Sequence, residues 1–560
     1  MSSFAADRRR VIAGLAASSA AAAFPFRTNA SEATGSPVFQ HGVASGDPDA
    51  TSVVLWTRIT AEGQQDVVWE VASDLGFREV VVSGSYATGP DRDHTVKLLA
   101  TGLNSGATYY YRFRLGNAVS IVGCTRTLPV GKLDRLGIAL VSCSNYPFGY
   151  FNAYDAIASD ASVEYVLHTG DYIYEYGAGG WGGDLGAKIG RVHEPANEIV
   201  SLADYRQRHA QYKTDAGAQA MHAAHPLLAC WDDHESANNP WTGGAQNHQP
   251  ETEGDWHSRR RASIQAYYEW MPVREPEWLD RKGGSRKQFW RCYNFGDLAM
   301  LHTLETRHTA RARQIDYADF SDHGHATHDA VMAAVNEPGR RMLASELERD
   351  LSAALRSSVD AGQPWRLIGN PMPIARTEVP DVVALGLVGD PEATPGLPEA
   401  AQTLAWKGKH RLPFYPDTWD GYGWARERLY DLSRKAGAGD LLFLTGDSHS
   451  FWANRLGDGE GRLVGIELGT AGVSSPGDFV GSGFDALTSA QLDKAFADFN
   501  PEIEWTDNLH QGYVRLELSH GSATASFIAV DTVLSPQYRT DILQRINILR
   551  RNNSVDLAIA

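Results

Sequence analysis

The stretch that decides the fold is Leu136-Gly137-Ile138-Ala139-Leu140-Val141, which runs directly into Ser142-Cys143-Ser144. A short apolar run that ends in small polar residues is typical of a strand buried on both faces. Similar runs stand at residues 163–167, 225–229, 298–301 and 440–444. Helical patterns at residues 150–159 and 202–222 separate the first three runs. This alternation predicts α/β architecture with buried strands from about residue 135 onward.

The residues before this stretch have a different pattern of apolar and polar side chains. Strands with alternating side chains are predicted at residues 52–59, 67–71 and 108–114, and turn residues such as Gly46-Asp47-Pro48 separate them. Over residues 34–130 this pattern predicts an all-β sandwich of the immunoglobulin or fibronectin type. Residues 129–134 are the expected linker to a second domain over residues 135–535.

Composition limits the classes of function. The 560-residue chain has 51 Lys and Arg against 68 Asp and Glu, which gives a formal net charge of −17. Such a surface repels nucleic acid and anionic lipid and argues against a nucleic-acid-coating role. The negative charge does not exclude a phosphate substrate, because bound metal ions can make the electrostatic potential inside one cleft positive. Four cysteines are too few for a disulfide scaffold.

The first 33 residues are predicted to be an export signal. Arg8-Arg9-Arg10 precede an Ala-rich apolar run at residues 13–24, and Ser31-Glu32-Ala33 supplies a small-x-small cleavage pattern. The paired arginines resemble a twin-arginine signal, which implies the twin-arginine export machinery as a partner of the precursor. A general secretory signal is the alternative. No later stretch reaches about 18 apolar residues, so we expect a periplasmic or secreted protein without stable membrane insertion.

Reactive side chains follow the ends of four of the predicted buried strands. These ends read Cys143-Ser144-Asn145, Gly170-Asp171-Tyr172-Ile173-Tyr174, Cys230-Trp231-Asp232-Asp233-His234-Glu235 and Gly446-Asp447-Ser448-His449. Ligands gather at the carboxyl ends of strands in open α/β sheets, so these side chains are expected to share one edge. Carboxylates suit hard cations, imidazole and thiolate suit softer ones, and phenolate suits ferric iron. The mixture predicts a multinuclear site with unlike metals.

These motifs, in this order, resemble the PhoD-like alkaline phosphatase and phosphodiesterase family of the calcineurin-like metallophosphatase superfamily. The superfamily pattern is altered in its first and third motifs, and the resemblance extends from near Phe39 to about Val533. Besides the strand ends, it rests on residues 41–48, 54–58, 204–208, 238–239 and 419–422. The resemblance implies an α/β metallophosphatase-type catalytic domain.

The resemblance also implies one ferric ion (Fe3+) and calcium (Ca2+) as cofactors. Under it, the iron ligands would be Cys143, Asp171, Tyr174, Asp447 and His449. Asp171 would bridge the iron to calcium, and Asp233 with Asn238 or Asn239 would complete the calcium side. The chain departs from the family where it reads Leu304-Glu305-Thr306-Arg307, because Asp is expected in place of Glu305. Arg307 is therefore not assigned a phosphate contact.

The expected chemistry is hydrolysis of phosphate esters by metal-activated water, with Asp171 and His234 as the catalytic candidates. His234 is expected either to protonate or hydrogen-bond the leaving group, or only to orient a ligand. Arg206 and Arg208 have side chains suited to phosphate, although on a helix they can equally brace the structure.

The predicted function is that of an exported metal-dependent phosphohydrolase acting on small phosphate monoesters, diesters or both. A phospholipase D-like phosphodiesterase is one alternative. A surface- or carbohydrate-binding protein with an inactive catalytic domain is another.

The C-terminal tail, residues 536–560, is predicted to be helical. Ile542, Leu543, Ile546 and Leu549 have the spacing of one helical face. Such a helix would dock on the flank of the domain, or it would cap the mouth of the active site.

Overall fold

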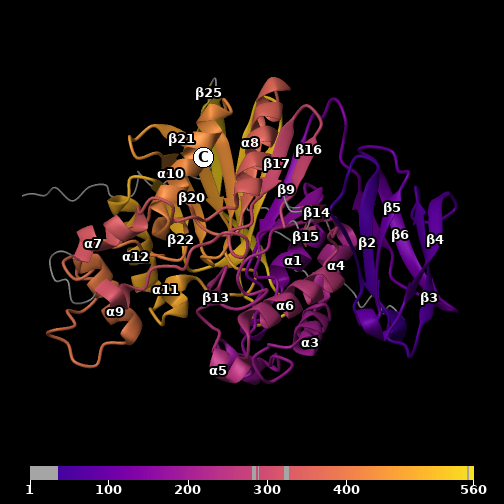
Figure 1. Ribbon diagram of the computed structural model, residues 1–560, viewed down its shortest axis with the longest axis horizontal. Coiled ribbons are helices and arrows are strands. Elements are labelled where there is room, and N and C mark those ends of the chain that lie inside the picture. Colours follow the sequence, from indigo (N-terminus) through magenta and orange to yellow (C-terminus); the bar gives the residue numbers. More distant parts are fainter. Residues whose placement is uncertain are drawn as a thin grey trace, which may run out of the picture.

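The computed structural model describes residues 36–275, 277–279, 285–287, 289–320, 327–551 and 554–559. The predicted export signal, residues 1–33, lies outside these ranges. Two large β-sheets form the centre of the molecule, helices cover their outer faces, and a β-rich N-terminal unit lies at one end (Figure 1). No helix in the described ranges has both the length and the apolar character needed to cross a membrane.

The first sheet contains the stretch that decides the fold. Its order is β26 (Ser554–Ile559), β25 (Thr540–Arg551), β24 (Ala523–Val530), β23 (Gln511–Leu518), β9 (Leu136–Val141), β10 (Tyr165–His168), β11 (Leu227–Ala229), β1 (Val43–Gly46), β2 (Ser52–Arg58) and β5 (Thr95–Thr101). Strands β9, β10 and β11 are parallel, and Val166 lies opposite both Ala139 and Leu227. Every residue of β9 is buried, as the apolar run predicted.

The apolar run predicted at residues 440–444 does not join this sheet. It forms β19 in a second sheet with the order β16 (Cys292–Phe295), β17 (Ala299–Thr303), β18 (Trp365–Asn370), β19 (Leu441–Thr445), β21 (Leu463–Gly469), β20 (Phe451–Gly457) and β22 (Ile503–Asp507). The four strand ends that were expected at one edge of the fold therefore come from two sheets and not from one. The two sheets meet where β9 ends, because Ser142 forms a parallel bridge with Gly472, which follows β21.

The faces of β9 explain the layers. Leu136, Ile138 and Leu140 pack between the two sheets, whereas Ala139 and Val141 face the helices of the first sheet. Those helices are α1 (Asn152–Ala158), α3 (Leu202–Tyr212), α4 (Ala216–Ala224) and α6 (Trp256–Trp270), and α8 (Ser345–Asp360) and α10 (Gly423–Lys435) cover the second sheet. The remaining helices are α2 (Gly183–Ile189), α5 (Pro250–Glu253), α7 (Thr327–Val335), α9 (Glu399–Lys409), α11 (Asp478–Gly481) and α12 (Ala486–Phe499).

The single helix predicted over residues 202–222 is two helices. Helix α3 ends at Tyr212, and the side chain of Asp215 accepts a hydrogen bond from the backbone N–H of Ala218 (3.1 Å) at the start of α4. A side-chain acceptor at this position favours the start of a new helix, which is why the pattern breaks there.

The N-terminal unit consists of two packed sheets. One contains β3 (Gln65–Ala72), β4 (Val80–Thr88), β6 (Thr108–Leu115), β7 (Ala118–Val119) and β8 (Gly123–Arg126), and it packs on β1, β2 and β5. The larger unit that follows residue 135 is the predicted catalytic unit. Because β1 pairs with β11, the second layer of the N-terminal unit continues into the first sheet of this catalytic unit. Two short hairpins lie elsewhere in the chain, β12 (Pro240–Trp241) with β13 (Gly244–Ala245) and β14 (Glu277–Leu279) with β15 (Ser285–Lys287).

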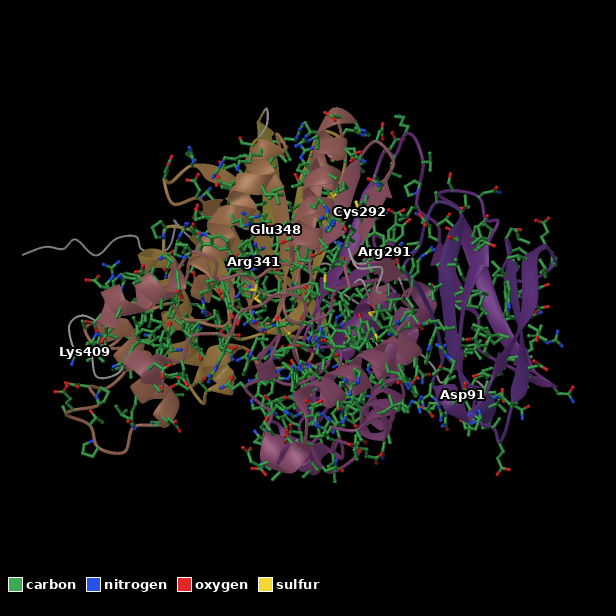
Figure 2. The ribbon with its side chains drawn as sticks, viewed as in Figure 1. Asp91, Arg291, Cys292, Arg341, Glu348 and Lys409 are labelled. Carbon is green, nitrogen blue, oxygen red and sulfur yellow. The ribbon has the colours of Figure 1, made fainter. Side chains whose placement is uncertain are left out.

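Asp47 fastens the N-terminal unit to the catalytic unit. Its side chain is 2% exposed and accepts hydrogen bonds from the backbone N–H of Arg274 (2.8 Å) and from the hydroxyl of Tyr293 (3.2 Å). The Nε of Arg291 lies 3.0 Å from the same carboxylate, and Figure 2 labels this arginine on the side of the catalytic unit nearest the N-terminal strands. The Gly-Asp-Pro turn at residues 46–48 therefore connects the two units.

The predicted C-terminal helix is wrong, because residues 540–551 and 554–559 form strands β25 and β26. Ile546 and Ile548 are buried and Leu549 is exposed, which is the two-residue period of a strand. A register shift in the pairing with β24 leaves Leu543 unpaired between Ile542 and Gln544. This extra residue interrupts the alternation of buried and exposed side chains, so the apolar residues of the strand have the spacing of a helical face. The hairpin forms the edge of the first sheet.

We expect Asp47→Ala to destabilise the protein by about 2 kcal/mol, because it removes a buried carboxylate that is hydrogen-bonded to Tyr293 and paired with the half-buried Arg274 and Arg291. The free energy of unfolding in urea measures the loss. Asp49→Ala is the matched control, since Asp49 is 60% exposed and lies 3.8 Å from Arg274. We expect the control to cost less than about 1 kcal/mol. An equal loss in the two variants would contradict the role of Asp47.

Candidate metal centre

The residues predicted for the iron side meet around the carboxylate of Asp171. The thiol of Cys143 lies 3.5 Å from Asp171 Oδ2, and the hydroxyl of Tyr174 donates a hydrogen bond to the same oxygen (3.2 Å). The Tyr174 hydroxyl also lies 3.2 Å from Nε2 of His449. Each of the four cysteines, all within the described ranges, is free of a disulfide, so the Cys143 thiol remains available.

Asp171 also belongs to a second cluster of possible ligands. In one grouping, an oxygen of Asp171 lies within 4.8 Å of the ligand atoms of Asp233 and His234. In another grouping, it lies within the same distance of the ligand atoms of Asp232, Asp233 and Asp447. Since a third grouping joins Asp171 to Cys143 and His449, Asp171 is common to all three. The geometry therefore gives this carboxylate the central position that the prediction assigned to a bridging ligand.

The two asparagines lie at the border of the second cluster. The backbone N–H of Asn239 donates to Asp233 Oδ2 (2.9 Å), and that of Asn238 donates to Glu175 Oε1 (2.7 Å). Both side-chain amides donate to the Oε1 atom of Gln246, at 3.0 Å from Asn238 and 2.8 Å from Asn239. Both asparagines are half-buried, at the partly open side of the site.

The backbone is strained at four of the predicted ligands. Cys143, Asp171, Asp447 and His449 have φ angles of 62°, 56°, 67° and 54°, in the left-handed region that non-glycine residues seldom adopt. Residues held in this way cluster at functional sites, where the surrounding structure fixes them. Glycine permits the close approach beside them, because a Cβ at Gly170 would lie 2.2 Å from the Cβ of Asp232.

The charges of the site favour bound cations. Burial, and then the neighbouring Asp233 and Asp232, raise the pKa of Asp171 well above its ordinary value. Burial followed by the charge of Asp171 likewise raises the pKa values of the Cys143 thiol and the Tyr174 hydroxyl. The Oδ2 of Asp232 and the Oδ1 of Asp233 are buried without a hydrogen-bond partner. Hard and soft anionic donors in this state fit metal ions, whose charge stabilises their deprotonated forms.

Arg307 supplies positive charge from the protein itself. Its Nε donates to Asp232 Oδ1 (2.6 Å) and its Nη2 donates to Asp447 Oδ1 (3.2 Å). The carboxylate of Glu305 accepts backbone hydrogen bonds from Arg307 (2.6 Å), His308 (2.5 Å) and Thr309 (2.9 Å). Glu305, which departs from the expected family residue, therefore fixes the turn that carries Arg307.

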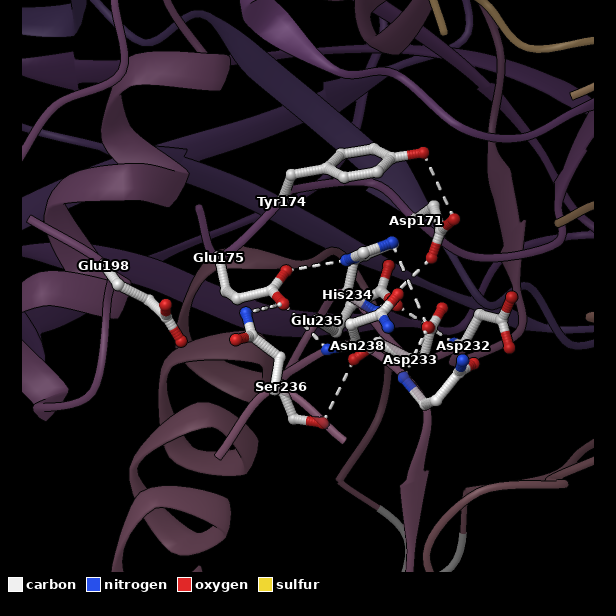
Figure 3. Close-up of polar contacts among 12 residues, drawn as sticks. Asp171, Tyr174, Glu175, Glu198, Asp232, Asp233, His234, Glu235, Ser236 and Asn238 are labelled. Atoms are coloured by element: carbon white, nitrogen blue, oxygen red, sulfur yellow. Dashed lines mark hydrogen bonds and ion pairs between the residues drawn. The ribbon is translucent and has the colours of Figure 1, made fainter. Parts of the chain in front are cut away.

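His234 lies between the second cluster and a buried glutamate. Its Nδ1 is 2.6 Å from Glu175 Oε2, its Nε2 is 3.9 Å from Asp233 Oδ2, and its ring stacks on Tyr174 with centroids 4.2 Å apart. Figure 3 shows Glu175 bridging His234 and the backbone of Asn238. Burial lowers the pKa of His234, but Asp233 and Glu175 outweigh it and raise the value to about 9. The two carboxylates therefore favour the protonated form of the ring.

The arginines of α3 are structural braces. Both guanidinium nitrogens Nε and Nη2 of Arg206 pair with the carboxylate of Glu269 (2.7 and 2.8 Å), and its Nη2 also donates to the carbonyl of Asp91 (2.8 Å). Arg208 is buried and donates to the carbonyls of Tyr174, Glu194 and Pro195. These contacts agree with the bracing alternative and leave the arginines no evident part in binding phosphate.

Sequence reasoning assigned no role to three carboxylates that organise the site. Glu175 orients His234, Asp232 pairs with Arg307, and Glu235 accepts the backbone N–H groups of Tyr172 (2.7 Å) and Asp232 (2.9 Å). All three are fully buried. Asp232 and Glu235 stand within a strand-end motif and Glu175 directly follows another, but a buried carboxylate and an exposed one look alike in a sequence.

Comparison with known proteins shows the family of the chain. The family model for PhoD-like phosphatase matches residues 138–527, and that for the N-terminal domain of PhoD-like phosphatases matches residues 21–129. The chain belongs to the PhoD-like phosphatase family. Alkaline phosphatase D of Bacillus subtilis (strain 168) is 32% identical over 95% of this chain and 85% of its own length. A solved structure titled "Structure of PhoD" is 30% identical, covers 93% of this chain and 92% of its own, and has a TM-score of 0.75.

We expect Glu175→Gln to lower the kcat of this PhoD-like protein on a phosphate monoester by about 10- to 100-fold, because an amide holds the His234 ring less firmly than a carboxylate. Steady-state kinetics on the folded variant measures the effect. Glu198→Gln is the control, because Glu198 is a nearby carboxylate that pairs with Arg259 (2.8 Å) instead of His234. Full activity of Glu175→Gln would show that His234 needs no such support.

Proposed function

We propose that this chain is an exported, metal-dependent phosphohydrolase with alkaline phosphatase activity on small phosphate esters. One observation carries the proposal: Asp171 is the common member of every ligand grouping in a buried site that also contains thiol, phenol and imidazole. Family membership and the similarity to alkaline phosphatase D support the same chemistry.

We assign the cofactors as Fe3+ and Ca2+. Cys143, Asp171, Tyr174, Asp447 and His449 would hold the iron, and Asp171, Asp233 and Asn238 would hold calcium, with Asn239 as the alternative to Asn238. When bound, the metals supply an activated water and neutralise the phosphate oxygens. Thiolate and phenolate suit ferric iron, while carboxylate and amide oxygens suit calcium.

The protein's own groups complete the proposed mechanism. His234 donates a proton or hydrogen bond to the leaving oxygen, because its Nδ1 is held by Glu175 and its Nε2 faces the carboxylate cluster. Arg307 offsets the repulsion among Asp232, Asp233 and Asp447. The inactive-domain alternative is less favoured, because the predicted iron ligands are all present and lie close together. The similarity to alkaline phosphatase D favours the phosphatase over the phospholipase D-like alternative.

We also infer the finer class of the two units. A catalytic unit with two stacked sheets between helical layers supports the metallophosphatase type. The two-sheet N-terminal unit supports an immunoglobulin- or fibronectin-like sandwich, with residues 34–130 and 135–535 as the proposed domains.

Hydrolysis of a chromogenic phosphate monoester and a chromogenic diester, with and without a chelator, tests the function. We expect turnover of at least one ester, its loss when the metals are removed, and its recovery when iron and calcium are restored. Turnover that persists in protein shown by elemental analysis to be free of metal would refute metal dependence. Absence of turnover in the metal-loaded protein would favour the binding-protein alternative.

We expect the purified protein to be coloured, because thiolate and phenolate ligands give charge-transfer absorption with ferric iron. Cys143→Ser should lose most of this absorption, and its activity should fall by more than about tenfold while the protein stays folded. Cys230→Ser is the control, since Cys230 is also buried but lies outside the three ligand groupings. A colourless, fully active preparation that contains zinc alone would refute the iron assignment.

We further propose twin-arginine export of the precursor to the periplasm or the medium. This route carries folded proteins, which suits a site that must be loaded with particular metals first. Replacing both Arg8 and Arg9 by Lys should leave the precursor in the cytoplasm, as cell fractionation would reveal. Normal export of this variant would indicate the general secretory route.

A further inference from the structure

A glycine-rich loop brings one large side chain to the metal centre. Residues 177–183 read Gly-Ala-Gly-Gly-Trp-Gly-Gly, and backbone hydrogen bonds join Gly180 to Gly177 (2.9 Å) and Gly183 to Gly180 (2.8 Å). A Cβ at Gly183 would lie 2.2 Å from the carbonyl oxygen of Ala178, and one at Gly182 would lie 2.8 Å from the ring of Phe148. These glycines are therefore steric requirements of a defined loop.

The side chain so placed is Trp181. Its indole stacks on the His449 ring with an interplanar angle of 18° and centroids 5.3 Å apart, and it also lies 5.9 Å from the Tyr174 ring. Phe148 meets it edge-on at 4.6 Å, and Tyr176 does so at 6.4 Å. We call Phe148, Tyr176 and Trp181 the aromatic wall.

The aromatic wall is partly open to solvent. All three of its members are half-buried, whereas Tyr174 behind them is fully buried. Apart from the buried Cys143 thiol and Tyr174 ring, the rest of the site is carboxylate, amide, guanidinium and imidazole, which suit phosphate and metal ions but offer little to an apolar group. An indole that keeps exposed surface beside such a site is suited to stacking on a flat ring.

We propose that the aromatic wall is a leaving-group subsite, which binds the flat aromatic ring of a phosphate ester while the phosphate occupies the metal centre. The inference rests on the proposed function and deepens it by naming the preferred substrate class. Hydrolysis breaks the P–O bond to the ring-bearing alcohol, the oxygen of water joins phosphorus, and the alcohol leaves with a proton. Because Trp181 contacts His449 and Tyr174, a ring attached near the ester oxygen lies within its reach.

The test compares wild type, Trp181→Ala and Trp181→Phe on 2-naphthyl phosphate and ethyl phosphate. Each result is the ratio of a variant's kcat/KM to that of wild type on the same ester, which cancels the difference in leaving-group reactivity. We expect Trp181→Ala to lose about tenfold on the naphthyl ester and less than about twofold on the ethyl ester. Trp181→Phe should recover much of the loss. Trp424→Ala is the control, because Trp424 is a half-buried tryptophan on α10 outside the metal centre.

Three measurements separate a subsite from a side chain that only shields His449. The inhibition constant of inorganic phosphate, which has no leaving group, should stay the same in Trp181→Ala with an unchanged metal content. Calorimetric binding of naphthylmethylphosphonate should weaken about tenfold while that of ethylphosphonate does not.

Equal losses on the two esters, a fall in metal content that accounts for the lost activity, or no loss at all would each overturn the subsite. A metal-loaded wild type that hydrolyses neither ester would overturn the proposed function, and the subsite with it.

Discussion

Mutual repulsion among buried carboxylates is the constraint on which the rest of the catalytic unit depends. Asp171, Asp232, Asp233 and Asp447 approach one another in a space closed to most solvent, and Arg307 is held among them by the Glu305 turn. Such an arrangement persists only if the scaffold prevents the carboxylates from moving apart. The parallel bridge between Ser142 and Gly472, the left-handed backbone at four predicted ligands and the absence of a Cβ at Gly170 all serve that end.

The N-terminal unit contributes to this rigidity from outside. Asp47 joins it to Arg274, Arg291 and Tyr293, and Arg206 of α3 reaches both Glu269 of α6 and the carbonyl of Asp91. The same helix carries Arg208, which holds the backbone at Tyr174. A continuous set of contacts thus runs from the N-terminal strands to one of the predicted metal ligands, so the unit supports the centre without supplying a ligand to it.

The sequence predicted which side chains lie together better than it predicted the strands and helices that carry them. A change from apolar to reactive residues marks the end of a buried strand in the sequence. The structure brings together the side chains that follow these ends, namely Cys143, Asp171, Tyr174, Asp233, Asp447 and His449. A strand buried on both faces has no sidedness in its sequence, so the membership of β19 in a second sheet was not visible. The bulge at Leu543 disguised a strand as a helix, and Asp215 divided one predicted helix into two. Glu175 and Asp232 gain their roles only through burial, which depends on distant parts of the chain.

The order of strands in the first sheet has a consequence for biogenesis. Strand β9 lies between β10 and β23, and Leu140 pairs with Val514, so a central strand awaits a partner made near the end of synthesis. Pairing of segments so distant in sequence is slow. The chain loses conformational entropy when the loop closes, before the contacts between the strands can stabilise it. The ribosome must release nearly the whole polypeptide before Cys143, at the end of β9, can acquire its final surroundings. Maturation of the centre is therefore a post-translational event, and a truncated or stalled chain would present its cysteine and carboxylates unassembled.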